Sequence, residues 1–138
     1  MKNFARALLI ITTIALTSMA ASAQTSKFLG KYKNVAGGIT TLEITGTGAA
    51  LKVHAWGQCS PTDCDWGTVP GFAYSDNVGS NPTTDALSVS AVFTTGFNST
   101  TLIITPLTNK QLLVTSYTRF TDSSGRVPYT STYILKKV

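Results

Sequence analysis

The fold is constrained most by a series of short segments rich in β-branched and aromatic residues, separated by clusters of Gly, Asn, Asp and Pro. This pattern is typical of strands joined by turns. In the segment 50–56, Leu51 and Val53 alternate with Lys52 and His54, which predicts a strand with one buried face. No segment has an extended helical apolar stripe, so the sequence predicts an all-β domain. About eight strands are expected, at residues 30–35, 39–45, 50–56, 68–75, 86–93, 100–106, 111–120 and 128–136.

The linkers between these segments predict antiparallel neighbours. Those at 36–38, 46–48 and 122–125 are short and contain Gly, which supplies the positive φ that tight hairpin turns need. Sequential strands joined by hairpins form a meander. We expect the strands to close into an eight-stranded antiparallel up-and-down barrel, which leaves no exposed edge; a two-sheet sandwich is the alternative.

Residues 1–23 have the organisation of a secretory signal peptide. A positively charged start precedes an apolar run at 7–20 and a small-residue cleavage site at 21–23. The apolar run is shorter than the about 20 residues that a membrane-spanning helix needs. We therefore expect cleavage after Ala23. The expected mature chain, 24–138, is a single domain, secreted or periplasmic, and not an integral membrane protein.

The charge of the mature chain argues against a nucleic-acid partner. Without Lys2 and Arg6, nine cations and six acidic residues leave a formal charge of +3. The cations are scattered along the sequence and no base-stacking motif accompanies them, so nucleic acid is not an expected partner.

The first residues of the mature chain, 24–27, are polar and expected to fray.

Both cysteines of the chain lie in the run AWGQCSPTDCDWG at 55–67. In an oxidising compartment, Cys59 and Cys64 are expected to form a disulfide. The bridge closes a ring of about six residues, so it stabilises one local turn by about 2 kcal/mol and cannot join distant parts of the fold. Pro61 favours the turn, and the neighbouring aspartates can accept hydrogen bonds from loop N–H groups. We call residues 57–67 the stapled loop.

Two tryptophans stand at the shoulders of the stapled loop and allow two interpretations. They either cover the end of the barrel, or form a platform on which a small hydrophobic, aromatic or sugar ligand stacks. If the barrel is hollow, its expected lining includes Tyr32, Phe72, Tyr117 and Tyr133. The candidate ligand-binding residues are Trp56, Trp66, His54, Asp63 and Asp65.

The sequence offers no catalytic residue, metal site or cofactor site. Asp63 and Asp65 supply too few oxygens for calcium, and His54, the single histidine, has no second His with which to hold zinc. The C-x4-C spacing differs from the C-x-x-C of redox proteins. We predict a non-enzymatic binding or structural module with a small ligand or a protein partner. A proteinase inhibitor that presents the stapled loop is the alternative; a hydrolase, less favoured, needs His54 and an Asp to converge.

The motif WG-x-C-x-P-x-D-C-D-WG at 56–67 resembles one found in small exported bacterial β-proteins of lipocalin-like or avidin-like outline. A looser similarity covers the run F-x-D-x-x-G-R-x-x-Y at 120–129. The resemblance implies a secreted, calycin-like β-barrel and supplies no catalytic residue. The sequence Gly30-Lys31-Tyr32 stands where a lipocalin has G-x-W, which separates the chain from true lipocalins.

Overall fold

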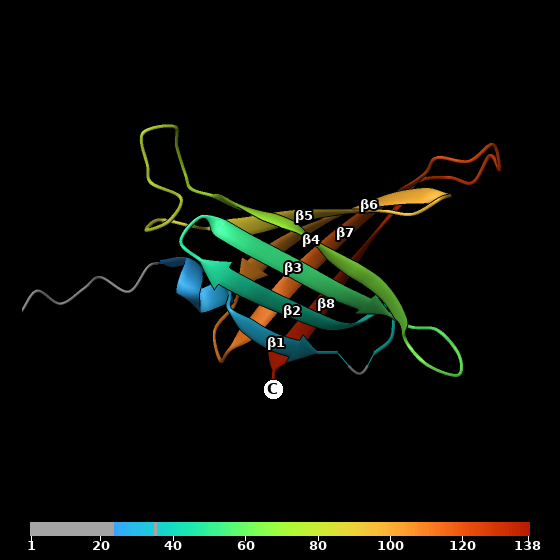
Figure 1. Cartoon of the computed structure of the whole chain (residues 1–138), viewed down its shortest axis with the longest axis horizontal. Helices are drawn as coiled ribbons and strands as arrows, with labels where there is room; N and C mark the ends of the chain where they lie inside the picture. Colours follow the sequence, from blue (N-terminus) through green and yellow to red (C-terminus); the bar gives the residue numbers. More distant parts are fainter. Residues whose placement is uncertain (1–23, 35) are drawn as a thin grey trace, which may run out of the picture.

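The computed structural model describes residues 24–34 and 36–138; the predicted signal peptide, residues 1–23, lies outside the described residues. The strands follow one another in sequence order around a closed antiparallel barrel, and the last strand returns to the first (Figure 1). This confirms the predicted all-β up-and-down barrel. The elements are the 3₁₀ helix η1 (Gln24–Phe28) and the strands β1 (Gly30–Lys33), β2 (Ile39–Thr47), β3 (Ala50–Gly57), β4 (Cys64–Tyr74), β5 (Ser88–Thr94), β6 (Asn98–Pro106), β7 (Gln111–Phe120) and β8 (Tyr129–Lys137).

Two local predictions are wrong. Strand β4 begins at Cys64, well before its predicted start at residue 68, so the second half of the stapled loop pairs with β3. The segment 24–27 does not fray, because η1 packs on one end of the barrel: Phe28 is fully buried there, and the Thr25 N–H donates to the Thr83 carbonyl at 3.3 Å. Among the described residues, no helix has the length and apolar character needed to cross a membrane.

The barrel interior is filled by the inward side chains of each alternating strand. Polar side chains on the inward faces of β6 and β7 are those of Thr100, Thr118 and Ser116. The hydroxyls of Thr100 and Thr118 bond each other at 3.0 Å, and the Ser116 hydroxyl donates to the Ser131 carbonyl at 3.4 Å. The largest fully buried side chains are those of Tyr32, Phe28, Ile39, Leu42, Ile44, Leu102, Ile104, Leu112, Leu135, Val53, Val89 and Val114.

The predicted aromatic lining is half wrong. Tyr32 is buried and Tyr133 packs against the core, as expected. Phe72 and Tyr117 instead lie on the outer surface, 60% and 54% exposed. The strand alternation explains this for Phe72: its neighbour Gly71 faces inward, where an added Cβ would lie 3.0 Å from Val53.

The two ends of the barrel differ in how completely its strands pair. Strand β4 pairs with β5 only over residues 71–74, and β1 pairs with β8 through Tyr32 and Lys33 alone. Toward the stapled loop the sheets β1–β4 and β5–β8 therefore diverge, as Figure 1 shows at its right-hand side. We call this the open end, and the end that carries η1 and the C-terminus the closed end.

Two neighbouring residues of β8 test which side chains of the strand face the core and which face the outer surface. Leu135 is fully buried in the core, whereas Ile134 is 50% exposed on the outer surface. We expect Leu135→Ala to lower the free energy of unfolding by about 2–5 kcal/mol, because it removes methyl groups and leaves a cavity. Ile134→Ala, the matched control, should cost less than about 1 kcal/mol. Urea unfolding measures both, and equal losses would contradict the assignment.

Candidate functional site

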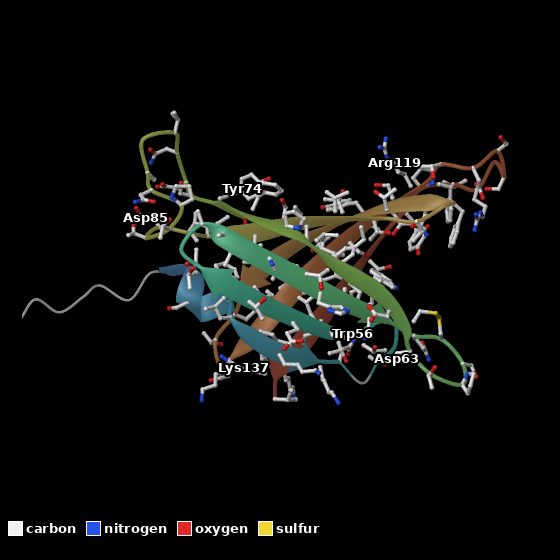
Figure 2. All side chains as sticks on the ribbon, in the orientation of Figure 1. Trp56, Asp63, Tyr74, Asp85, Arg119 and Lys137 are labelled. Atoms are coloured by element: carbon white, nitrogen blue, oxygen red, sulfur yellow. A yellow bond between two sulfur atoms is a disulfide. The ribbon has the colours of Figure 1, made fainter. Side chains whose placement is uncertain are left out.

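The predicted disulfide is confirmed: Cys59 and Cys64 are bonded, with their Cα atoms 5.4 Å apart. The stapled loop projects from the open end, where Figure 2 shows the sulfur atoms. Two hydrogen bonds fix its base. The Gln58 N–H donates to the Gly38 carbonyl at 2.7 Å, and the Thr40 hydroxyl donates to the Asp63 carboxylate at 2.6 Å. Asp63, a predicted ligand-binding residue, is therefore used to anchor the loop.

A β-bulge where the stapled loop enters β4 sets the direction of every later side chain. On β3, Ala55 stands opposite two residues of β4, Trp66 and Gly67, because the register shifts between the pairs His54–Thr68 and Trp56–Asp65. Gly67 takes the left-handed backbone conformation that the bulge needs, with φ of 81°. The extra residue sends Trp66 inward and keeps the residues on both sides of the bulge on the outer surface.

The bulge brings Asp65 and Thr68 to the same histidine. His54 Nε2 lies 2.6 Å from the Asp65 carboxylate, and His54 Nδ1 lies 3.0 Å from the Thr68 hydroxyl. Asp65 also accepts the Gly67 N–H at 2.7 Å. That backbone bond, followed by the bond to His54, lowers the pKa of Asp65 below its usual value. An aspartate and the histidine thus converge, which the hydrolase alternative required.

Trp56 completes this outer cluster. Its ring stacks on the His54 imidazole, with centroids 3.8 Å apart and planes at 6°, and the Lys31 ammonium lies 5.2 Å from its centroid. Trp56 and Trp66 lie on opposite faces of the sheet, so they do not form the single platform that the sequence suggested. The packing of His54 and Lys31 on Trp56 explains why this indole is half-buried on an outer surface.

Trp66 spans the region where the sheets diverge. Its indole lies over Gly57 of β3, where an added Cβ would come within 2.7 Å of the ring. On the opposite side it meets the buried Phe93 of β5 edge to face, with centroids 5.8 Å apart. Trp66 therefore connects β3 and β5 at a level where β4 and β5 share no backbone pairing.

A cavity of about 380 Å³ lies beside Trp66, between the stapled loop and the turn that joins β5 to β6. Aromatic rings and the disulfide form its apolar wall, and short polar side chains stand among them. Phe97 is half-exposed at the rim, and the Arg126 guanidinium lies over its ring, 5.3 Å from the centroid. The lining residues are Cys59, Cys64, Asp65, Trp66, Phe93, Thr95, Phe97, Asn98 and Thr100.

The predicted site residues are thus divided among three places. Trp56 and His54 belong to the outer cluster, Asp63 anchors the loop, and Asp65 contacts both the cluster and the cavity. Trp66 alone of the predicted aromatic pair lines the cavity. Sequence reasoning missed Phe93, Phe97 and Thr100, which lie far from the motif along the chain and carried no signal except strand alternation.

In the described part of the chain, no group of three or more His, Cys, Asp and Glu side chains is placed to hold a metal ion. Comparison of the chain with protein-family models, curated proteins and solved structures finds no match. The resemblance of the 56–67 motif to exported bacterial β-proteins stays a prediction, although the barrel that it implied is confirmed.

The hydrogen bonds of Asp65 predict its titration. Since its folded pKa is lowered, the carboxylate stabilises the fold fully above its unfolded pKa of about 3.9, and this stabilisation is lost as pH falls through the lower folded value. Carbon NMR of the side chain should give a midpoint below about 3.9. In His54→Ala the midpoint should rise only part of the way, because the Gly67 N–H remains. A wild-type midpoint at or above the ordinary value would contradict this geometry.

The disulfide should make a small, local contribution to stability. The double variant Cys59→Ser with Cys64→Ser is expected to lose about 2 kcal/mol of unfolding free energy, because its unfolded state is no longer restricted by the short covalent loop. Far-ultraviolet circular dichroism should keep the β signature of the barrel. Collapse of the whole fold in the double variant would show that the bridge supports more than its own turn.

Proposed function

We propose that this protein is an exported, non-enzymatic β-barrel that binds a small ligand in the cavity beside Trp66. The observation that carries the proposal is that three aromatic side chains and the disulfide line a cavity of about 380 Å³ at the open end. This volume lies within the range of about 300–1,000 Å³ that small-molecule sites occupy. The exported location rests on the predicted signal peptide and on a disulfide that an oxidising compartment would preserve.

The lining supports a ligand with a flat apolar ring and a few polar groups. Trp66, Phe93 and Phe97 offer ring faces and edges, on which aromatic molecules and sugars stack. Asn98 and Thr95 bond each other at 3.2 Å and lie on the same wall, and the Thr100 hydroxyl lies deeper. These few polar groups suit orientation of a ring rather than binding of a strongly charged molecule.

The fluorescence of Trp66 alone tests the proposal. Trp56→Phe removes the other tryptophan and leaves a single indole in the cavity wall. Titration of this variant with sugars, fatty acids and aromatic metabolites should give a saturable change in emission for at least one class. If Trp66 only packs against the barrel and binds no ligand, no compound in the panel should give a saturable change. That result would contradict the proposal.

Two phenylalanines provide a matched pair for the same titration. In the Trp56→Phe background, Phe97→Ala should weaken binding about tenfold, because about 1.4 kcal/mol of ring contact with the ligand is lost. Phe72→Ala removes an equal side chain from the outer surface of β4 and should leave the affinity unchanged. Equal weakening by both substitutions would place the binding elsewhere.

The exposed stapled loop supports a second candidate, a proteinase inhibitor. Residues 58–65 are all exposed, while the disulfide and the Thr40–Asp63 bond hold the loop at its base. A loop fixed in this way binds a partner at a lower entropic cost than a mobile one. Tight inhibition of an exported protease that is lost in Pro61→Ala would favour this candidate over ligand binding.

The contacts of His54 with Thr68 and Asp65 keep a hydrolase as a third candidate. The Thr68 hydroxyl contacts the His54 imidazole, which in turn contacts the Asp65 carboxylate. This order of contacts matches that of a nucleophile, a general base and an orienting carboxylate. The cluster lies on the outer surface of the barrel, and Trp56 covers one face of the imidazole. Hydrolysis of ester or amide substrates that disappears in both His54→Ala and Asp65→Asn would favour this candidate.

A further inference from the structure

A second cavity, of about 610 Å³, lies at the closed end of the barrel, away from the stapled loop. Three lysines line it, and each comes from a different part of the chain: Lys27 from η1, Lys110 from the turn between β6 and β7, and Lys137 from the end of β8. Tyr32 and Leu107 add an apolar surface to the same cavity. No carboxylate side chain is among the residues that line it.

Contacts with neighbouring groups hold Lys137 at the cavity, and Lys110 stands out for its backbone conformation. The Lys137 ammonium donates to the Leu29 carbonyl at 2.8 Å and lies 5.9 Å from the centroid of the Tyr32 ring. Figure 2 shows this side chain at the closed end, beside β1. Lys110 has a left-handed backbone, with φ of 57°, a conformation that lysine adopts less readily than glycine or asparagine.

Within the described part of the chain, no ion pair joins any of these lysines to a carboxylate. Asp76 and Asp85 share a neighbouring cavity with Lys27 but form no ion pair with it. Lys33 and Lys136, which do not line the cavity, stand opposite each other across the pairing of β1 with β8 and add two further cations to the outer surface of this seam.

We propose that this cavity is a binding site for a phosphate monoester with an apolar or aromatic body. At neutral pH a phosphate monoester carries a charge of about −1.5 to −2, which suits several ammonium groups better than a single carboxylate does. The cavity is larger than a bare phosphate, and Tyr32, Leu107 and Pro106 offer contact to the rest of the ligand. The site is separate from the cavity beside Trp66 and stands or falls independently of the proposed function.

Isothermal titration calorimetry with phenyl phosphate at constant ionic strength tests the site. The expected result is saturable binding with a Kd below about 1 mM. Inorganic phosphate and benzyl alcohol, which each carry one half of the ligand chemistry, should bind more weakly. Backbone amide shifts on addition of phenyl phosphate should concentrate at residues 106–111 and at Lys137. Equal affinity for benzyl alcohol and phenyl phosphate would overturn the proposal, because it would show that the lysines contribute nothing.

Three substitutions distinguish binding by the lysines of the cavity from binding by positive charge elsewhere on the surface. Lys110→Gly removes an ammonium and suits the left-handed backbone, and Lys137→Met keeps an aliphatic side chain against Tyr32. Each should weaken binding of phenyl phosphate about fivefold to tenfold, and the double variant more than either. Lys52→Met, on the exposed face of β3, should leave the Kd unchanged. Equal weakening by Lys52→Met would overturn the site.

The same phosphate group could belong to a soluble compound or to a lipid headgroup. Vesicles of phosphatidylcholine with and without phosphatidic acid, which presents a phosphate monoester, distinguish these sources. Binding of phenyl phosphate supports a soluble ligand. Binding confined to the phosphatidic acid vesicles, and weakened by Lys110→Gly, supports a lipid headgroup. Absence of both kinds of binding from a protein that keeps its fold by circular dichroism would overturn the proposal.

Discussion

The arrangement at the open end depends on the β-bulge that places Trp66 and Gly67 opposite Ala55. Asp65 and Thr68 are three residues apart, so in a regular strand with no bulge they would face opposite sides of the sheet. With the bulge, both reach His54 on the outer surface, while the indole of Trp66 between them turns inward. A single irregularity therefore produces the outer cluster and the wall of the cavity together.

The sequence predicted the parts of the fold that follow from local patterns. It did not predict which side chains the strand register brings together. Alternation and turn chemistry were enough to predict eight strands in a meander, and the expected export of a chain with a single pair of cysteines was enough to predict the disulfide. The WG-x8-WG frame suggested equivalent indoles, but the two glycines differ: Gly57 leaves room for the ring of Trp66, and Gly67 takes the left-handed conformation of the bulge. Phe97 enters the site through the pairing of β5 with β6, which a motif in β3 and β4 cannot reveal.

The two ends of the barrel offer different chemistry to a ligand. At the open end, aromatic rings gather where β4 and β5 separate, and Asp65 is the acidic side chain on the cavity wall. At the closed end, lysines from three segments surround a larger cavity. Because the barrel interior between them is filled with side chains such as Leu102 and Val114, the two cavities are separate and do not form one channel.

The strand order also has a consequence for how the chain reaches this structure. Seven of the eight strand pairings join neighbours in the sequence, so each can form early as a hairpin with little loss of chain entropy. The pairing of Lys33 with Lys136 joins residues from the two ends of the described chain, and only Tyr32 and Lys137 add a second pair. Ring closure is thus the step with the greatest sequence separation and the fewest backbone contacts, which makes it the natural last event of folding.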